Sequence, residues 1–168
     1  MKQKEIASLH KVLEYKNQKV IDKTILYFNI TTEEANEIFQ ELLKWLWLCA
    51  KAKYERNQNK IEVPPVLNVQ AGIIIIDEIW HIFLLHTRDY EEFCHKYLGT
   101  FVHHSPAGIE RFPPSRLETK NQLSYIYDNL GKETLSKWYL NYPIQYSLKN
   151  IKNLRKDPLE YLLKKEEL

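Results

Sequence analysis

The feature that most constrains the fold is a long apolar run in the middle of the chain, AGIIIIDEIWHIFLLH at residues 71–86. Four consecutive isoleucines are compatible with a buried strand, because β-branched residues favour strands. However, the apolar character continues well beyond the length of an ordinary strand, which favours a helix. Because apolar residues would surround such a helix on nearly all sides, we expect residues 72–86 to form a central helix buried in the core.

The rest of the chain favours an all-α fold. Its 168 residues contain only four glycines, which suits helices better than sheets with tight hairpins. We expect a single compact helical domain of about six or seven helices at residues 1–146, followed by a basic C-terminal helical tail at 147–168. Apolar spacing predicts further helices at about 4–28, with a break near Asn17, and at 31–55, 88–98 and 115–129.

Capping residues mark the ends of these helices. Thr31 and Glu34 fit a capping box at the start of the second helix. Thr87 is the expected N-cap of the helix that follows the central one. Gly99 and Gly131 are the expected closing residues of the next two helices. The dipeptide at 157–158, Asp-Pro, predicts the start of a last helix.

Composition excludes several classes of protein. The net charge of +2 gives no strong sign of nucleic-acid binding. Two cysteines are too few for a disulfide framework, and we expect both thiols to be free in a reducing compartment. The N-terminus lacks the apolar core of a signal peptide, and no run is long and apolar enough to span a membrane. We therefore expect a cytoplasmic protein, with non-classical export as an open alternative.

The candidate site lies in residues 76–106, which contain five of the six histidines. Asp77 and His81 are four residues apart and therefore share one helix face. His86 lies about 180° from Asp77 around the helix and about 140° from His81, so the same centre cannot easily include it. The pair Asp77 and His81 is therefore the unit to which other ligands would be added.

The loop that carries His103 and His104 is free to fold back and complete this cluster. Zinc or another divalent metal prefers three or four nitrogen, oxygen or sulfur ligands, which these residues would supply. Two other interpretations stay open, namely a structural hydrogen-bond network and acid–base catalysis by a histidine oriented by Asp77. Cys94 is a further candidate ligand, but its place on an apolar stripe favours the core. We expect Trp80, Tyr90 and Cys94 to support the site structurally.

Residues 77–106, DEIWHIFLLHTRDYEEFCHKYLGTFVHHSP, resemble the conserved segment of the glycine-rich domain-containing protein-like family. The resemblance extends over about residues 35–140. The matching residues are Asp77, Trp80, His81, Thr87, Tyr90, Phe93, Cys94, Gly99, Phe101, His103, His104 and Pro106. The resemblance implies a compact all-helical domain without an assigned reaction. RNA binding has been suggested for some plant members, but this chain lacks their glycine-rich region.

Three functions are compatible with these patterns. The first is a small helical domain that binds a protein or small-molecule partner and has a candidate metal site. The second is a metal-dependent or His/Asp-dependent enzyme of unknown substrate. The third is an adaptor, or a secreted bacterial effector, that docks through the basic C-terminal helix.

Overall fold

A computed structural model describes residues 5–105 and 113–157 of the chain. These residues form an all-α fold, as the sequence predicts, and within them no helix is long and apolar enough to cross a membrane. The α-helices are α1 (Leu9–Leu13), α2 (Gln18–Tyr27), α3 (Thr32–Asn57), α4 (Ile74–Leu85), α5 (Thr87–Phe93), α6 (Arg116–Ser136), α7 (Tyr142–Gln145) and α8 (Leu148–Leu154). Three short helical segments connect them: the 3-10 turn η1 (Ala71–Ile73) and the π-helical turns η2 (Cys94–Leu98) and η3 (Lys137–Asn141).

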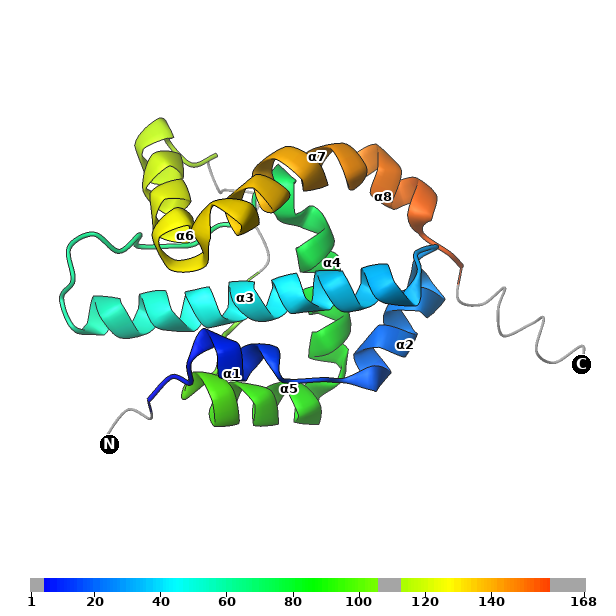
Figure 1. Ribbon diagram of the computed structural model, residues 1–168, viewed down its shortest axis with the longest axis horizontal. Coiled ribbons are helices and arrows are strands. Elements are labelled where there is room, and N and C mark those ends of the chain that lie inside the picture. Colours follow the sequence, from blue (N-terminus) through cyan, green and yellow to red (C-terminus); the bar gives the residue numbers. More distant parts are fainter. Residues whose placement is uncertain (1–4, 106–112, 158–168) are drawn as a thin grey trace, which may run out of the picture.

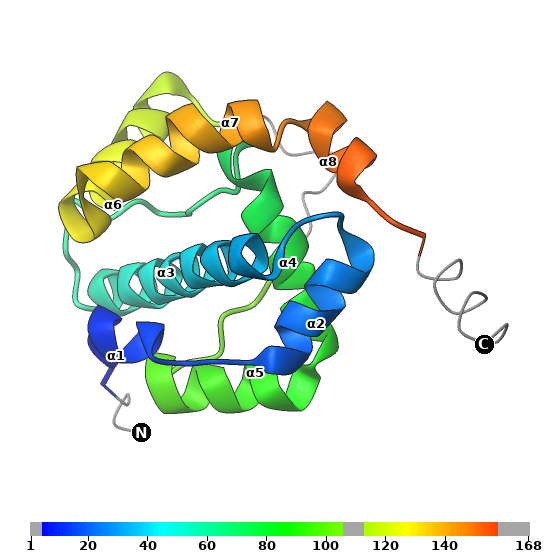
Figure 2. The same ribbon diagram turned by 45° about the vertical axis from the view of Figure 1, so that its right-hand side comes forward.

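Helix α3 runs through the middle of the molecule between two groups of helices. In Figures 1 and 2, α1, α2 and α5 lie on one side of it, and α6, α7 and α8 lie on the other. Helix α4 crosses α3 and packs against it. The capping box of Thr31 and Glu34 starts α3 as predicted. Its predicted apolar stripe is buried at Ile38, Leu42, Trp45 and Leu46.

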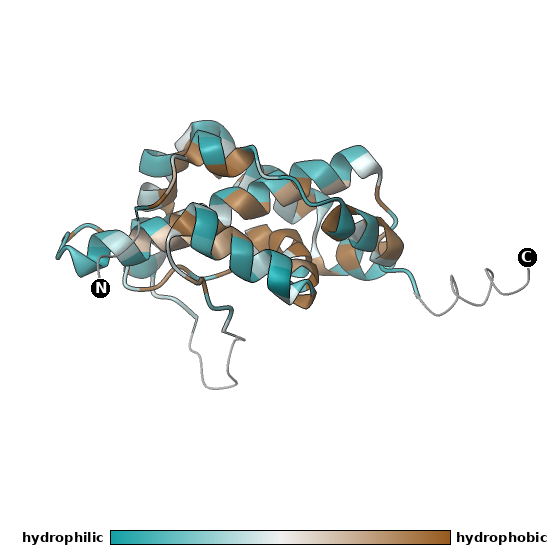
Figure 3. Cartoon of the chain, turned by 90° about the horizontal axis from the view of Figure 1, so that it is seen from below, coloured by the Kyte–Doolittle hydropathy of each residue, from teal (hydrophilic) through white to brown (hydrophobic). Residues whose placement is uncertain are grey.

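Helix α4 is the buried helix that the apolar run predicts. The buried side chains are those of Ile75, Ile76, Ile79, Trp80, Ile82 and Phe83. In Figure 3 the hydrophobic stretches, drawn in brown, lie mostly between the helices, and the hydrophilic stretches lie mostly on the outward sides. The polar residues Asp77 and Glu78 are half-buried on α4, and each has a partner from a distant part of the chain.

Several predicted helix ends are confirmed. Asn17 interrupts the first helical stretch and caps α2, because its side chain accepts a hydrogen bond from the backbone N–H of Val20. Gly99 ends η2 in the left-handed conformation at φ 66°. The first helix, however, begins at Leu9, several residues later than the spacing predicts.

One predicted helix end is wrong. Thr87 is the first residue of α5 rather than its N-cap, because His86 already holds the non-helical conformation that ends α4 and begins α5. Gly131, by contrast, is confirmed as the break that ends the helix starting after Ser115. Its φ of 81° and ψ of 171° are not helical, and a second helical stretch, included in α6, follows it as far as Ser136.

The segment after α7 packs on the helical domain as far as it is described. The backbone N–H of Asn29 donates to the Leu154 carbonyl over 2.7 Å, and that of Lys156 donates to the Tyr27 carbonyl over 2.8 Å. The Arg155 guanidinium pairs with the Glu78 carboxylate at 2.6 Å. These contacts attach residues 154–156 to α2 and α4. The predicted last helix, which would begin at Asp157, lies beyond that residue and thus outside the described part of the chain.

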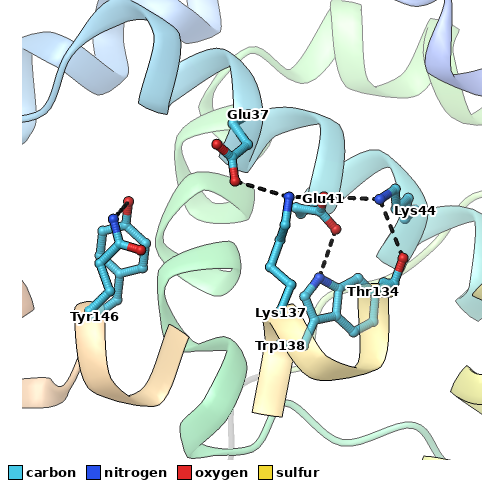
Figure 4. Close-up of polar contacts among 8 residues, drawn as sticks. Glu37, Glu41, Lys44, Thr134, Lys137, Trp138 and Tyr146 are labelled. Atoms are coloured by element: carbon cyan, nitrogen blue, oxygen red, sulfur yellow. Dashed lines mark hydrogen bonds and ion pairs between the residues drawn. The ribbon is translucent and has the colours of Figure 1, made fainter. Parts of the chain in front are cut away.

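A buried carboxylate attaches α6 and η3 to α3. Glu41 accepts a hydrogen bond from the Trp138 indole at 2.9 Å and forms ion pairs with Lys44 and Lys137 at 2.9 and 3.2 Å (Figure 4). The Lys44 ammonium also donates to the Thr134 hydroxyl. All oxygens of Glu41 are thus partnered, which is what a buried charge requires. This network has a structural role in joining the layers.

Candidate metal centre and groove

Asp77 and His81 on α4 lie beside His104 from the loop that follows η2. The His104 Nε2 is 2.8 Å from Asp77 Oδ1, and the His81 Nδ1 is 3.6 Å from Asp77 Oδ2. The two imidazole rings are 4.5 Å apart between centroids. One ligand atom from each residue lies within 4.8 Å of the other two. We call these three residues the Asp/His cluster.

His104 is held in place by packing as well as by Asp77. Its ring stands edge-on to the Trp80 indole, with 4.4 Å between the centroids. Only 13% of the His104 side chain is exposed, whereas 53% of the His81 side chain is exposed. The cluster therefore has a buried side at His104 and an accessible side at His81.

The loop at residues 99–105 is positioned by a buried tyrosine. The Tyr90 hydroxyl donates to the Val102 carbonyl at 2.6 Å and accepts a hydrogen bond from the Trp80 indole N–H at 3.1 Å. Burial raises the pKa of Tyr90, so this hydroxyl keeps its proton. Trp80 and Tyr90 thus fix the loop at Val102, two residues before His104. These contacts agree with the structural role predicted for both residues.

His103 is not part of the cluster. It is exposed, and its ring packs against Phe101 with 4.8 Å between the centroids. Within the described residues, the group with metal-ligand spacing contains Asp77, His81 and His104. Of the four candidate ligands, the structure therefore brings three together.

Cys94 is a core residue, and Cys49 is partly buried against the core. Cys94 is fully buried, and burial raises the pKa of its thiol. Burial likewise raises the pKa of Cys49 to about 12. A thiol that stays protonated at neutral pH is a poor nucleophile and a poor metal ligand. Cys94 therefore acts as a packing residue, in agreement with the interpretation that places it in the core.

An open groove of about 1110 Å³ lies next to the cluster. Asp77, Trp80 and His104 line one part of it. Its other walls come from α3, from the segment between α3 and η1, from the loop at 99–105 and from the start of α6. Apolar side chains such as Trp80 and Phe101 alternate in these walls with charged and polar ones such as Lys53, Arg56 and Glu118.

The donor set fits a divalent transition metal. Imidazole nitrogen and carboxylate oxygen bind zinc at about 2.0–2.2 Å, which places ligand atoms roughly 3.3–3.5 Å apart in a tetrahedron. The distances within the Asp/His cluster require side-chain shifts of roughly 0.5–1.5 Å to reach that spacing. A bound metal would replace the proton that His104 now shares with Asp77. Three protein ligands would leave a fourth position for water or a ligand.

Two basic residues that line the groove were not predicted from the sequence as site residues. Lys53 and Arg56 lie on α3, and both line the groove. Their spacing of three residues near the end of a predicted helix places them on one face, which was the available signal. That this face turns toward the Asp/His cluster depends on how α3 and α4 cross, which no local pattern encodes.

Comparison with known proteins identifies a family for the chain. No curated protein and no solved structure matches the chain. The model of the UCP032817-like family matches residues 6–122. This range includes α1 to η2, the whole Asp/His cluster and the start of α6. The chain belongs to the UCP032817-like family.

Proposed function

We propose that this domain binds one divalent transition metal, such as zinc, through Asp77, His81 and His104, and presents it to a ligand in the adjacent groove. The observation that carries the proposal is the approach of three ligand atoms from α4 and the loop to within 4.8 Å of one another. A small helical ligand-binding domain is the general function that follows.

The surroundings of the cluster support binding over a purely structural network. A structural network has no need of an exposed member, yet His81 is about half exposed. The cluster also borders a groove rather than a closed core. Two histidines and one carboxylate are the ligand set of many open sites for iron and zinc.

A metal-dependent reaction is the second candidate function. The observation in its favour is the fourth coordination position, which three protein ligands leave to water. A metal held by these residues would activate a bound water near neutral pH, and the groove that Asp77 and His104 line would hold a substrate beside it. The described residues offer no buried thiolate as an alternative nucleophile, because burial raises the pKa of both cysteines.

The test is metal binding by the purified full-length chain. The protein is treated with EDTA, titrated with zinc by calorimetry, dialysed and subjected to elemental analysis. We expect about one zinc per chain, and we expect His81→Gln and His104→Gln to weaken binding at least tenfold. His103→Gln is the matched control, because it removes an exposed neighbouring imidazole and should leave binding unchanged. Absence of binding, or equal loss in His103→Gln, would contradict the proposal.

Other sequence-based interpretations stay predictions. These are the relation to the glycine-rich domain-containing protein-like family, the cytoplasmic location and docking through the basic tail. The described part of the tail uses Arg155 to pair with Glu78, so that side chain already has a partner within the domain. Fractionation of cells that express the tagged full-length chain tests the location.

A further inference from the structure

The groove beside the Asp/His cluster carries two cationic side chains of its own. Lys53 and Arg56 are three residues apart on α3, and both line the groove. Lys44 and Lys137 pair with Glu41, and Lys51 and Lys60 pair with Glu55. By contrast, neither Lys53 nor Arg56 forms an ion pair with a carboxylate of the described residues.

Neutral partners hold these two side chains in place. The Lys53 ammonium donates to the Thr100 hydroxyl at 2.9 Å, and the Arg56 guanidinium donates to the Pro64 carbonyl at 2.7 Å. These bonds orient the side chains but do not neutralise them, and each cation retains free N–H donors. Such preorganised donors lose little conformational entropy when they bind an anion.

The two carboxylates among the described groove residues have hydrogen-bond partners of their own. Glu118 accepts a hydrogen bond from the backbone N–H of Ser115 at 2.7 Å in the capping box of α6. Asp77 accepts one from His104 at 2.8 Å. Among the described residues neither carboxylate pairs with Lys53 or Arg56, so the positive charge of the groove is concentrated on the side of α3.

The cations and the Asp/His cluster are close enough for one ligand to reach both. Thr100, which contacts Lys53, and His104 belong to the same loop and are four residues apart. Even a fully extended chain would separate their Cα atoms by at most about 14 Å. The apolar side chains of Trp80 and Phe101 line the groove as well.

From this arrangement we propose that the groove binds an organic anion with an apolar body and a carboxylate or phosphate group. Lys53 and Arg56 bind the anionic group, and Trp80 and Phe101 pack against the body. A second polar group of the ligand occupies the open position of the metal. Only this contact with the metal rests on the proposed metal-binding function, because Lys53 and Arg56 can bind the anionic group without a metal.

The experiment is calorimetric titration of the full-length chain with three probes that share one apolar body: 1-naphthyl phosphate, 1-naphthoate and the neutral 1-naphthalenemethanol. We expect both anions to bind at least tenfold more tightly than the alcohol, with and without zinc. Each hydrogen bond from a cation to a charged group corresponds to about a tenfold change, so Lys53→Gln and Arg56→Gln should each weaken anion binding by about that factor. The ratio of phosphate to carboxylate affinity identifies the anionic group.

Matched variants separate charge from folding. Thr100→Val removes the hydrogen bond to Lys53 but keeps the cation, so it should weaken anion binding less than Lys53→Gln. Lys152→Gln removes an exposed lysine of α8 and should have no effect. If Arg56→Gln lowers the melting temperature, Arg56→Lys replaces it as the test variant, because it keeps the positive charge.

The outcomes distinguish the two proposals. Equal binding of the alcohol and the anions, or an equal loss in Lys152→Gln and Lys53→Gln, would overturn the anion site. Zinc binding without any anion binding would leave the metal centre and reject the anion site. Anion binding that depends on Lys53 and Arg56 in a chain that binds no zinc would support the anion site and reject the metal centre.

Discussion

At the scale of single residues, the two histidines of the cluster differ in what holds them. His104 is mostly buried, pairs with Asp77 and packs on Trp80. His81 is about half exposed, and its 3.6 Å approach to Asp77 is longer than a hydrogen bond. His104 therefore contributes to the stability of the fold as well as to the candidate metal site, whereas His81 contributes mainly to the metal site.

This difference predicts unequal effects on stability in the absence of metal. In EDTA, His104→Ala should lower the free energy of unfolding by about 1–3 kcal/mol, because it leaves a half-buried carboxylate without its partner. His81→Ala should change it by less than about 0.5 kcal/mol, as for most surface substitutions. Urea unfolding followed by tryptophan fluorescence measures both. A loss in His81→Ala as large as that in His104→Ala would show that the cluster is a structural network.

At the scale of elements, the loop at 99–105 depends on α5 for its position. Tyr90 binds the loop at Val102 and also binds Trp80 on α4. One hydroxyl thus sets the distance between the helix that carries Asp77 and the loop that carries His104. Residues that orient metal ligands in this way commonly contribute to metal affinity without touching the metal.

Tyr90→Phe therefore should weaken zinc binding by about tenfold, in the range found for residues that orient ligands. It should also destabilise the apo protein by about 1–3 kcal/mol, because an indole N–H and a carbonyl lose their partner in the core. Tyr127→Phe is the control, since Tyr127 is exposed. Calorimetric titration with zinc measures the affinity, and unchanged affinity in Tyr90→Phe would show that the loop is held by its other contacts.

Replacing the glycine at the kink in α6 by alanine should strain the backbone. Gly131 has φ 81° and ψ 171°, a region that is nearly restricted to glycine. An added Cβ would meet no atom within 4 Å, so Gly131→Ala tests backbone strain alone. We expect a loss of about 1–3 kcal/mol in the free energy of unfolding, measured in urea. Lys132→Ala, at an exposed neighbouring position, should change stability little, and equal effects would contradict the role of the kink.

The elements show which structural features the sequence could predict. Apolar spacing and the capping box at Thr31 identify α3 and α4, because these signals are local. The same signals place Thr87 at a cap, which is wrong by one residue, and Gly131 at a helix end, which is confirmed. Local residue types thus show where a helix breaks to within a residue or two.

The candidate site, likewise, could be predicted from the sequence only in part. The four-residue spacing of Asp77 and His81 predicts their shared face, which the structure confirms. The choice between His103 and His104 could not be made, because neighbouring residues in an extended chain point to opposite sides. The choice depends on how Tyr90 positions the loop, which is a contact across the fold.

At the scale of the whole molecule, two buried glutamates of α3 join it to α6 and to the segment between them. Glu41 binds Trp138 and Lys137 at one place along α3. Glu55 binds the Tyr125 hydroxyl at 2.7 Å and pairs with Lys51 and Lys60 at 2.6 and 2.7 Å. The α6 side of the groove is therefore attached to α3 through charged groups, and its stability should depend on pH.

Glu55 makes that dependence testable. Burial opposes its charge, but hydrogen bonds from Lys51, Lys60 and Tyr125 outweigh burial and lower the pKa of this carboxyl from 4.5 to about 2. Because the folded pKa lies below the unfolded one, its contribution is present above pH 4.5 and is lost as the pH falls to about 2. Glu55→Gln should thus cost about 1.5–3 kcal/mol at neutral pH. Urea unfolding should show this deficit shrinking between these pH values, while the exposed Glu62→Gln follows the wild type throughout. A deficit that stays constant down to pH 2 would mean that Glu55 acts through packing rather than charge.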